Sequence, residues 1–355
     1  MNKRSKQIIE ALSSRVYRLS LFILFISVVS SCDSILDYDE GDCTVEYRVK
    51  FKYDYNMKFA NAFAKEVERV TLYAFDEDGK FVYQKMEEGN RLKADDYSMK
   101  VDIEPGKYHL VAWAGLVNES YAIPLLVPGK SNIEELTVQT NRITQTRAAN
   151  GQLINVVGNI ASLWHGESLQ SFTRAGRQEE ITISLVKNTN AFRVILQQMD
   201  GVPIDVNAFD FSITDDNGFM NYNNSLLKDD LLTYQPYSRS TGGITRSAGK
   251  TRADSDETTP ISTAIADLKV GRLVENQKPR LTITNKETKE TVLSIPLLDY
   301  LILTKSIEYD DMPAQEYLDR EDRYTMTFFL DPNMAWLKTE ILINDWVIRI
   351  NENDL

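Results

Sequence analysis

Two cysteines, Cys32 and Cys43, are the residues whose type and spacing most directly point to chemistry. They are the only cysteines among 355 residues, and they flank the acidic segment DSILDYDEGD. Two such thiols could form a disulfide, could contribute to a metal site, or could act separately with one of them covalently modified. The choice between these possibilities bears on where the protein works.

The segment before Cys32 is organised like a secretory signal. Residues 1–18 are basic, residues 19–29 (LSLFILFISVV) are almost all apolar, and Ser30 and Ser31 precede the cysteine. A basic region, a short apolar stretch and small residues before a cleavage point are typical of a signal peptide. A membrane-spanning helix would need about 20 apolar residues. We therefore predict a signal peptide over residues 1–31, cleaved between Ser31 and Cys32.

Cys32 is the predicted site of lipid attachment. The run Val29-Ser30-Ser31-Cys32 resembles a relaxed lipobox of bacterial lipoproteins, in which the cysteine becomes the new, acylated N-terminus. The lipid would then hold a folded domain on a membrane. Cys43 would be left without a disulfide partner, and no histidine lies close to it in the sequence. Residues 32–43 are thus predicted to be an acidic tether, and Cys43 an unreactive residue at the first strand.

The net charge of the chain argues against a nucleic-acid partner. It is −12 overall, and residues 1–31 carry five basic residues and one acidic residue, so their removal leaves −16. Such a surface repels phosphate backbones.

Short β-strands are predicted along the rest of the chain. Strict alternation of apolar and polar residues over 44–54 predicts a first strand with one buried face. Further strands are expected over 181–199 and from residue 323 almost to the end, with about two helical turns over 59–69. Turn residues between β-rich runs predict hairpins in four places: 70–86 around Asp78-Gly79, 97–116 around Pro105-Gly106, 209–224 around Asn217-Gly218, and 280–298.

Many short strands at close spacing predict an all-β protein of two β-sandwich domains in series, over residues 44–188 and 189–355. Residues 238–263 are rich in Ser, Thr, Gly and Arg and have little to bury. We predict that they form a mobile loop in the second domain.

We find no motif for catalysis or for binding a metal or cofactor. The run Gly243–Thr251 resembles a phosphate-binding loop, but five residues separate its glycines where four are needed. The loop that begins at Asp76 lacks an oxygen ligand and a glycine where calcium requires them. We predict that the protein is not an enzyme and has no cofactor. A lipid-anchored hydrolase that uses two carboxylates far apart in sequence stays open as an alternative.

Taken in order, several segments of the chain together resemble the FimB-type fimbrial anchor lipoproteins, which belong with the fimbrillins of type V pili. The resemblance runs from Cys32 over most of the remaining chain. Besides the two cysteines, its segments are FKYDYNMKFANAF, VTLYAFDEDGKFV, EPGKYHLVAWAGL, SLWHGE, LVKNTNAFRVIL and SITDDNGFMNYNN.

The resemblance implies two transthyretin-like or immunoglobulin-like β-sandwich domains behind a lipidated N-terminus. It implies a fimbrial subunit, exposed at the surface of the outer membrane, that anchors a pilus shaft, helps to set its length and supports cell adhesion. The implied partners are a pilin, bound by β-strand complementation or edge contact, and the outer membrane. Only Cys32 receives a chemical role, and no catalytic residue is implied.

Two expectations about strands follow. The strand over 44–54 should stay in its own sheet, because its loss would also remove the tether. Residues 340–355 are either a strand donated to the shaft or the last core strand, and the second interpretation is preferred because no long tail follows. A carbohydrate-binding or adhesive surface lipoprotein is an alternative function, which clustered, exposed Trp and Tyr side chains would favour.

Overall fold

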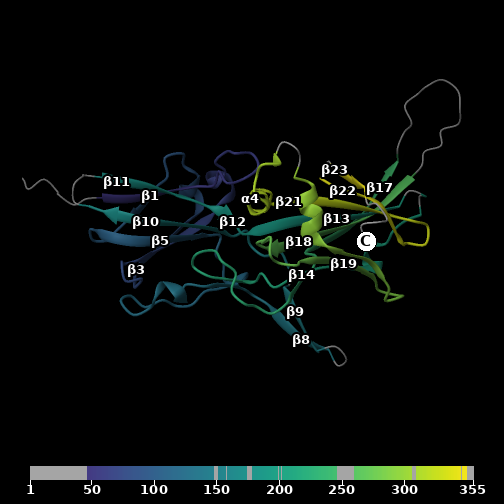
Figure 1. Cartoon of the computed structure of the whole chain (residues 1–355), viewed down its shortest axis with the longest axis horizontal. Helices are drawn as coiled ribbons and strands as arrows, with labels where there is room; N and C mark the ends of the chain where they lie inside the picture. Colours follow the sequence, from purple (N-terminus) through teal and green to yellow (C-terminus); the bar gives the residue numbers. More distant parts are fainter. Residues whose placement is uncertain are drawn as a thin grey trace, which may run out of the picture.

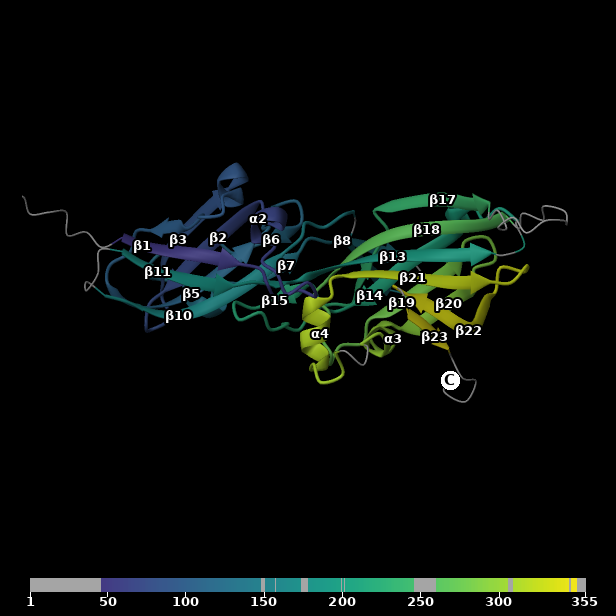
Figure 2. The same ribbon diagram turned by 90° about the horizontal axis from the view of Figure 1, so that it is seen from above.

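Two β-sandwich lobes follow one another along the long axis of the molecule (Figure 1). The computed structural model describes residues 46–147, 151–156, 158–173, 178–198, 200, 202–245, 260–305, 309–344 and 346–349. In these residues helices are short and strands dominate, which confirms the predicted all-β class. Strand β1 begins at the outer end of the first lobe, whereas β17, β22 and β23 lie in the second lobe (Figures 1 and 2).

The first lobe packs a small sheet against a larger one. The three-stranded sheet has the order β11 (Gln178–Ser184), β1 (Glu46–Lys52), β4 (Met99–Val101). The five-stranded sheet has the order β12 (Val186–Lys187), β10 (Trp164–Phe172), β5 (Gly106–Ala114), β2 (Arg69–Phe75), β3 (Phe81–Glu88). Their facing side chains, which include Val49, Leu72 and Ile183, form one continuous core.

Strand β1 is an inner strand. It pairs in parallel with β11 over seven residues and antiparallel with β4 on its other side. Tyr47, Val49 and Phe51 are buried and the residues between them are not, as the period-two pattern predicts. Residues 46–52 therefore form an inner strand of the chain's own sheet, and the expectation that this strand is retained during assembly stays a prediction.

A third layer covers the outer face of the five-stranded sheet, where Tyr73, Phe75 and Trp113 are buried. It contains the 3-10 turn η2 (Ile133–Glu135) and a small sheet, in the order β15 (Phe219–Met220), β7 (Val138–Thr140), β6 (Tyr121–Ala122). Met220 therefore belongs to the core of the first lobe although it comes from the second half of the chain. The 3-10 turn η1 (Gly89–Lys93) instead buries Leu92 in the core between the two sheets.

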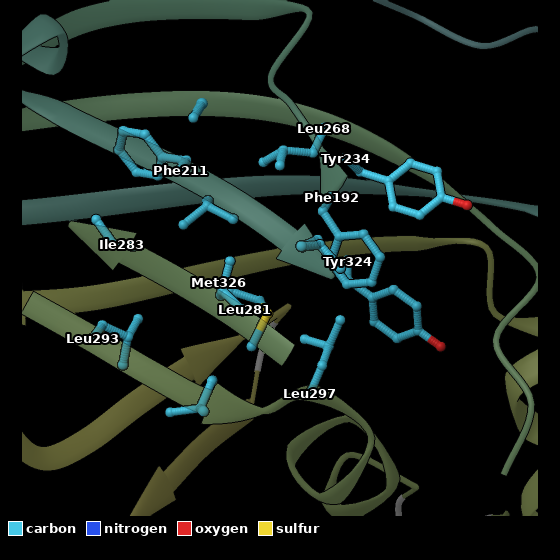
Figure 3. Close-up of a cluster of buried hydrophobic side chains, with 14 of the residues drawn as sticks. Phe192, Phe211, Tyr234, Leu268, Leu281, Ile283, Leu293, Leu297, Tyr324 and Met326 are labelled. Carbon is cyan, nitrogen blue, oxygen red and sulfur yellow. The ribbon is translucent and has the colours of Figure 1, made fainter. Parts of the chain in front are cut away.

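The second lobe is a sandwich of two six-stranded sheets. One sheet has the order β17 (Ser238–Thr245), β18 (Pro260–Gly271), β13 (Thr189–Gln198), β21 (Arg323–Leu330), β22 (Trp336–Ile343), β23 (Trp346–Arg349). The other has the order β20 (Thr291–Pro296), β19 (Arg280–Asn285), β14 (Phe209–Asp215), β16 (Leu232–Tyr234), β9 (Gly151–Val156), β8 (Ile143–Arg147). Phe192, Phe211 and Leu281 meet in the core between them (Figure 3).

The helical segments lie outside the sheets. They are α2 (Phe63–Glu66), the 3-10 turn η3 (Val206–Ala208), α3 (Leu297–Leu303) and α4 (Ala314–Arg320). The helix predicted over 59–69 is shorter than expected, because β2 already begins at Arg69. In both views α4 lies at the junction of the two lobes (Figures 1 and 2).

The lobes exchange segments. The hairpin β8–β9 lies within the predicted first domain, 44–188, yet β9 pairs in parallel with β16 of the second lobe. In return, β15 pairs with β7 of the first lobe. A division of the chain into consecutive domains is therefore wrong for residues 143–156. The sequence gives no sign of the exchange, because strand alternation does not identify the partner strand.

Two of the four predicted hairpins are confirmed, and two are wrong. Strands β2 and β3 pair directly, as do β19 and β20. Strands β4 and β5 belong to different sheets, so Pro105-Gly106 lies where the chain crosses the sandwich. Strands β14 and β15 are likewise in different sheets. A turn signal marks a change of direction, which a hairpin and a crossover share.

The loop predicted over 238–263 is also wrong in part. Residues 238–245 form β17, which pairs over its whole length with residues 260–267 of β18, so residues 260–263 are also in a strand. Residues 246–259, and with them part of the rejected phosphate-loop pattern, lie outside the described residues. The polar composition misled the prediction, because backbone pairing with β18, itself paired with β13, provides hydrogen bonds that need no apolar side chains.

Replacing Met220 tests the exchange of segments. Its side chain is buried in the first lobe, so Met220→Ala should lower the free energy of unfolding by about 3 kcal/mol in urea titrations. Met86→Ala is the matched control, since Met86 is 46% exposed, and should change stability by less than about 0.5 kcal/mol. Equal effects of the two replacements would contradict a core role for Met220.

Candidate assembly interface

The predicted tether lies outside the described residues. Ser31, Cys32 and Cys43 all precede Glu46, where β1 begins. Beyond Glu46 the path of the chain is defined: β1 runs from the outer end of the first lobe toward the junction (Figure 2). A pull on the N-terminal side of β1 would act along a strand held by neighbours on both sides, so its backbone hydrogen bonds would share the load.

Residues shortly after β1 contact the second lobe. The guanidinium of Arg320, at the end of α4, lies 4.0 Å from the ring centroid of Tyr55 and 4.8 Å from that of Phe59. Met57 N donates a hydrogen bond to the carbonyl oxygen of Arg320 at 3.2 Å. Glu316, one turn earlier in α4, accepts from the same guanidinium at 2.7 Å. These contacts connect β1 to the second lobe through a short length of chain.

Lys187 is a buried cation at the junction, where β12 continues into β13. Its ammonium lies 2.8 Å from Glu66 of α2 and also pairs with Asp322, the residue before β21. Its side chain is only 6% exposed, and Nζ lies 5.2 Å from the ring centroid of Trp164. Two carboxylates from different lobes therefore neutralise one buried ammonium, and this ion-pair triad joins the lobes.

A second polar cluster forms where residues 216–228 return to the first lobe. Arg272 donates to both carboxylate oxygens of Asp319 at 2.8 Å and to the carbonyl oxygen of Asn224 at 2.8 Å. The Asn224 amide in turn exchanges hydrogen bonds with that of Asn188. Both asparagines are buried, so these bonds satisfy groups that water cannot reach.

His165 has a structural position. Its Nε2 donates to the carbonyl oxygen of Tyr222 at 2.6 Å, and its ring packs on Trp113. Burial, the largest effect, lowers the pKa of His165 to about 4. The imidazole is therefore neutral at physiological pH and helps to fix the returning segment.

Other titratable side chains also have structural contacts. His109 pairs with Glu167 at 2.7 Å near the surface. The Asp76 carboxylate accepts from the backbone of Asp78 and Lys80, which makes this loop a hairpin turn. Asp229 is held by Arg142. In the described part of the chain, no group of three or more His, Cys, Asp or Glu side chains could hold a metal ion.

Among the helices that the structure describes, none has the length and apolar character needed to cross a bilayer.

Strand β23 lies at one edge of its sheet in the described part of the chain. It is the outermost strand of its sheet, and Trp346 and Val347 are 52% and 56% exposed. Its position is fixed by Asn344, which has a φ of 51°, donates to Thr325 O at 2.7 Å and accepts from Thr325 N at 2.8 Å. Edge strands usually carry charged residues, Pro or a bulge that prevents further pairing; WVIR has no proline, its pairing with β22 has no bulge, and Arg349 is its one charged residue. Among the described residues, no strand pairs with the other side of β23.

The neighbouring strand β22 belongs to the core. Ile341 and Ile343 are fully buried in the second lobe, and β22 pairs with both β21 and β23. Donating this strand to another subunit would open the core. The described residues between 340 and 349 therefore support the last-core-strand interpretation.

Comparison with known proteins establishes the family. The sequence profile of the fimbrillin-A associated anchor proteins Mfa1 and Mfa2 matches residues 39–352. The chain belongs to this anchor family. A comparison with curated proteins finds no match.

Solved structures agree in fold. A provisionally assigned adhesin from Bacteroides thetaiotaomicron shares 38% identity over 86% of this chain and 97% of its own, with a TM-score of 0.73. A protein from the same species, provisionally described as polysaccharide binding, shares 34% identity over 88% of this chain and 100% of its own, with a TM-score of 0.72. The fimbrial anchor protein Mfa2 from Porphyromonas gingivalis matches over 86% of this chain and 99% of its own at 18% identity and a TM-score of 0.59, a likeness of fold alone.

The family is one of fimbrial anchors, and the structural relatives are described as adhesins or as polysaccharide binding rather than as enzymes, so together they support a fimbrial or adhesive role. The tryptophans do not form the exposed cluster that would favour a carbohydrate-binding face. Trp113 and Trp164 are buried, Trp336 packs on Phe328, and Trp346 lies on the β23 edge.

Removing the buried cation should weaken the junction. Lys187→Met leaves Glu66 and Asp322 without their shared partner, so we expect the free energy of unfolding to fall by about 3 kcal/mol. Lys50→Met is the control: Lys50 pairs with Glu180 at the surface, and its loss should cost less than about 1 kcal/mol. Urea denaturation measures both, and a cost for Lys187→Met no larger than the control would refute the role of the triad.

The pKa of His165 predicts a response to acid. Because its folded pKa of about 4 is below the usual 6.5, the stability from this group is complete above pH 6.5 and is lost as the pH falls toward 4. The full difference corresponds to about 3 kcal/mol. In His165→Gln, unfolding should therefore depend less on pH between 6.5 and 4 than in wild type. Parallel pH profiles of the two proteins would contradict this.

Proposed function

We propose that the protein is a lipid-anchored fimbrial subunit that fastens a pilus shaft to the outer membrane at the cell surface. The observation that carries the proposal is that β1, the strand nearest the tether, is an inner strand of its own sheet in a member of the anchor family. The signal-like N-terminus and Cys32 supply the membrane attachment in this proposal.

The arrangement of contacts suits a tethered subunit. Force applied to the tether would act first on β1 and then on residues 55–59. The contacts of these residues with Arg320 would transmit it to α4. The Lys187 triad and the exchanged strands join the same two lobes. A subunit with one flexible linker between its lobes would have no comparable path.

The same strand offers a reason for limited shaft length. A subunit can accept a neighbour's strand only where its own sheet leaves a groove. In the first lobe the position beside β11 and β4 is filled by β1, which also carries the tether. We propose that assembly therefore ends at this subunit, and that the shaft contacts it at another edge, with β23 the favoured one because of Trp346 and Val347.

Pilin capture tests attachment and contact separately. The full chain should co-purify with the cell's own pilins, and Cys32→Ala should retain pilin binding in extracts but no longer partition with membranes. Val347→Lys places a cation on the β23 edge and should reduce pilin recovery at least tenfold. Leu169→Lys is the matched control, because Leu169 is 77% exposed on β10 of the other lobe, and should leave recovery unchanged.

The outcomes separate the parts of the proposal. Membrane partitioning of Cys32→Ala equal to wild type would refute lipid attachment. Failure of the wild-type chain to recover any pilin would refute the anchoring role. Full recovery by Val347→Lys would move the shaft contact away from β23.

A further inference from the structure

Basic residues gather on the outer face of the second lobe, beside the junction. Ala191 on β13 lies directly opposite Lys269 on β18 and Arg323 on β21. Residues paired in this way project from the same face of a sheet, so the two cations flank a small alanine. The inner face of the same strands is apolar, with Phe192, Leu268 and Tyr324 in the core.

A pocket of about 180 Å³ occupies this place. Thr189 and Lys187 line the pocket at its end nearer the first lobe. They lie on the same face as Ala191, because alternate residues of a strand point to the same side of the sheet. Asn159, Ser162 and Tyr237 add amide and hydroxyl groups to its wall, and Asp322 adds a carboxylate. The pocket therefore offers both positive charge and uncharged hydrogen-bonding groups in a space for one small polar molecule.

One cation of the pocket lacks a direct partner. Lys187 is matched by Glu66 and Asp322, and Asp322 also lies 3.9 Å from Arg323. Lys269 has no ion-pair or hydrogen-bond partner among the described residues. Glu321 also acts on Arg323, so the three cations have three carboxylates near them: Glu66, Asp322 and Glu321. Lys269 alone lines the pocket without a direct partner, and a bound anion would supply one.

The pKa of Lys269 agrees with this picture. Burial, followed by the nearby charges of Lys187 and Arg323, lowers it to about 8, while Asp322 acts in the opposite direction. A half-buried ammonium without a partner is costly, and an oxyanion beside it would stabilise its charged form.

We propose that this pocket is a binding site for a small oxyanion, namely a carboxylate, sulfate or phosphate group carried by a sugar-sized polar ligand or present as the free ion. Lys269 and Arg323 bind the anionic group, and the side chains of Asn159, Ser162 and Tyr237 bind neighbouring hydroxyl groups. The site is independent of the proposed shaft contact, because β23 lies at the edge of the sheet, two strands beyond β21.

Calorimetric titration of the full chain tests the site with four probes: galacturonate, galactose, inorganic sulfate and inorganic phosphate. We expect saturable binding of at least one anion, and at least tenfold weaker binding of galactose. Lys269→Met and Ala191→Leu should each weaken anion binding at least tenfold. The first removes the positive charge, and the second places a larger side chain in the pocket. Lys278→Met is the charge-matched control, because Lys278 is exposed on the same lobe outside this pocket, and should bind as wild type.

Proton uptake gives a readout that a merely structural lysine would not affect. At pH 8 wild type should take up protons on binding, because the anion raises the pKa of Lys269, and Lys269→Met should take up fewer. If Lys269→Met does not fold, Arg323→Gln replaces it, since Arg323 is 76% exposed.

Tighter binding of galacturonate than of sulfate and phosphate would identify a sugar-borne group as the ligand, and the reverse would identify a free ion. Absence of binding by all three anions, or unchanged binding in both Ala191→Leu and the Lys269 or Arg323 variant, would overturn the proposal.

Discussion

The neutralisation of one buried ammonium, that of Lys187, is the constraint on which the arrangement of the lobes depends. The lysine lies where β12 of the first lobe becomes β13 of the second, and its partners come from both sides: Glu66 from α2 and Asp322 from the start of β21. An ammonium in this position without carboxylates would be strongly destabilising. The two lobes therefore have to meet at a fixed distance and orientation, which the stacked contacts of Arg320 with Tyr55 and Phe59 also require.

The exchange of strands joins the two lobes at the same junction, in addition to the ion pairs. The β8–β9 hairpin completes a sheet in the second lobe, and β15 completes the cover of the first. Each lobe thus buries apolar residues contributed by the other part of the chain, with Met220 the clearest example. In the proposed role, with the subunit held at one end and bound at the other, such a junction would transmit force without relying on a single linker.

Much of the secondary structure was predictable, because strand alternation and tight turns are local properties. The alternation of Tyr47, Val49 and Phe51 identified β1, and Asp78-Gly79 identified the β2–β3 hairpin. The failures have a common cause. Pro105-Gly106 and Asn217-Gly218 resemble hairpin turns but lead to another sheet, and the polar run over 238–245 forms a strand through backbone pairing alone. In each case the deciding partner is distant in sequence. Nothing local marked Lys187 or Lys269 either, since an unexceptional lysine becomes important only through what surrounds it.

By itself the sequence determined the strand-rich class, the acidic charge, the signal-like N-terminus with its cysteine, and enough ordered segments to indicate the anchor family. These are properties of composition and of neighbouring residues. The tertiary structure alone decided that β1 is an inner strand, that the lobes exchange strands, that β23 lies at one edge of its sheet, and that Ala191, Lys269 and Arg323 form one row beside the junction. Strand pairing joins residues far apart in the chain, and its register is set by how the whole core packs.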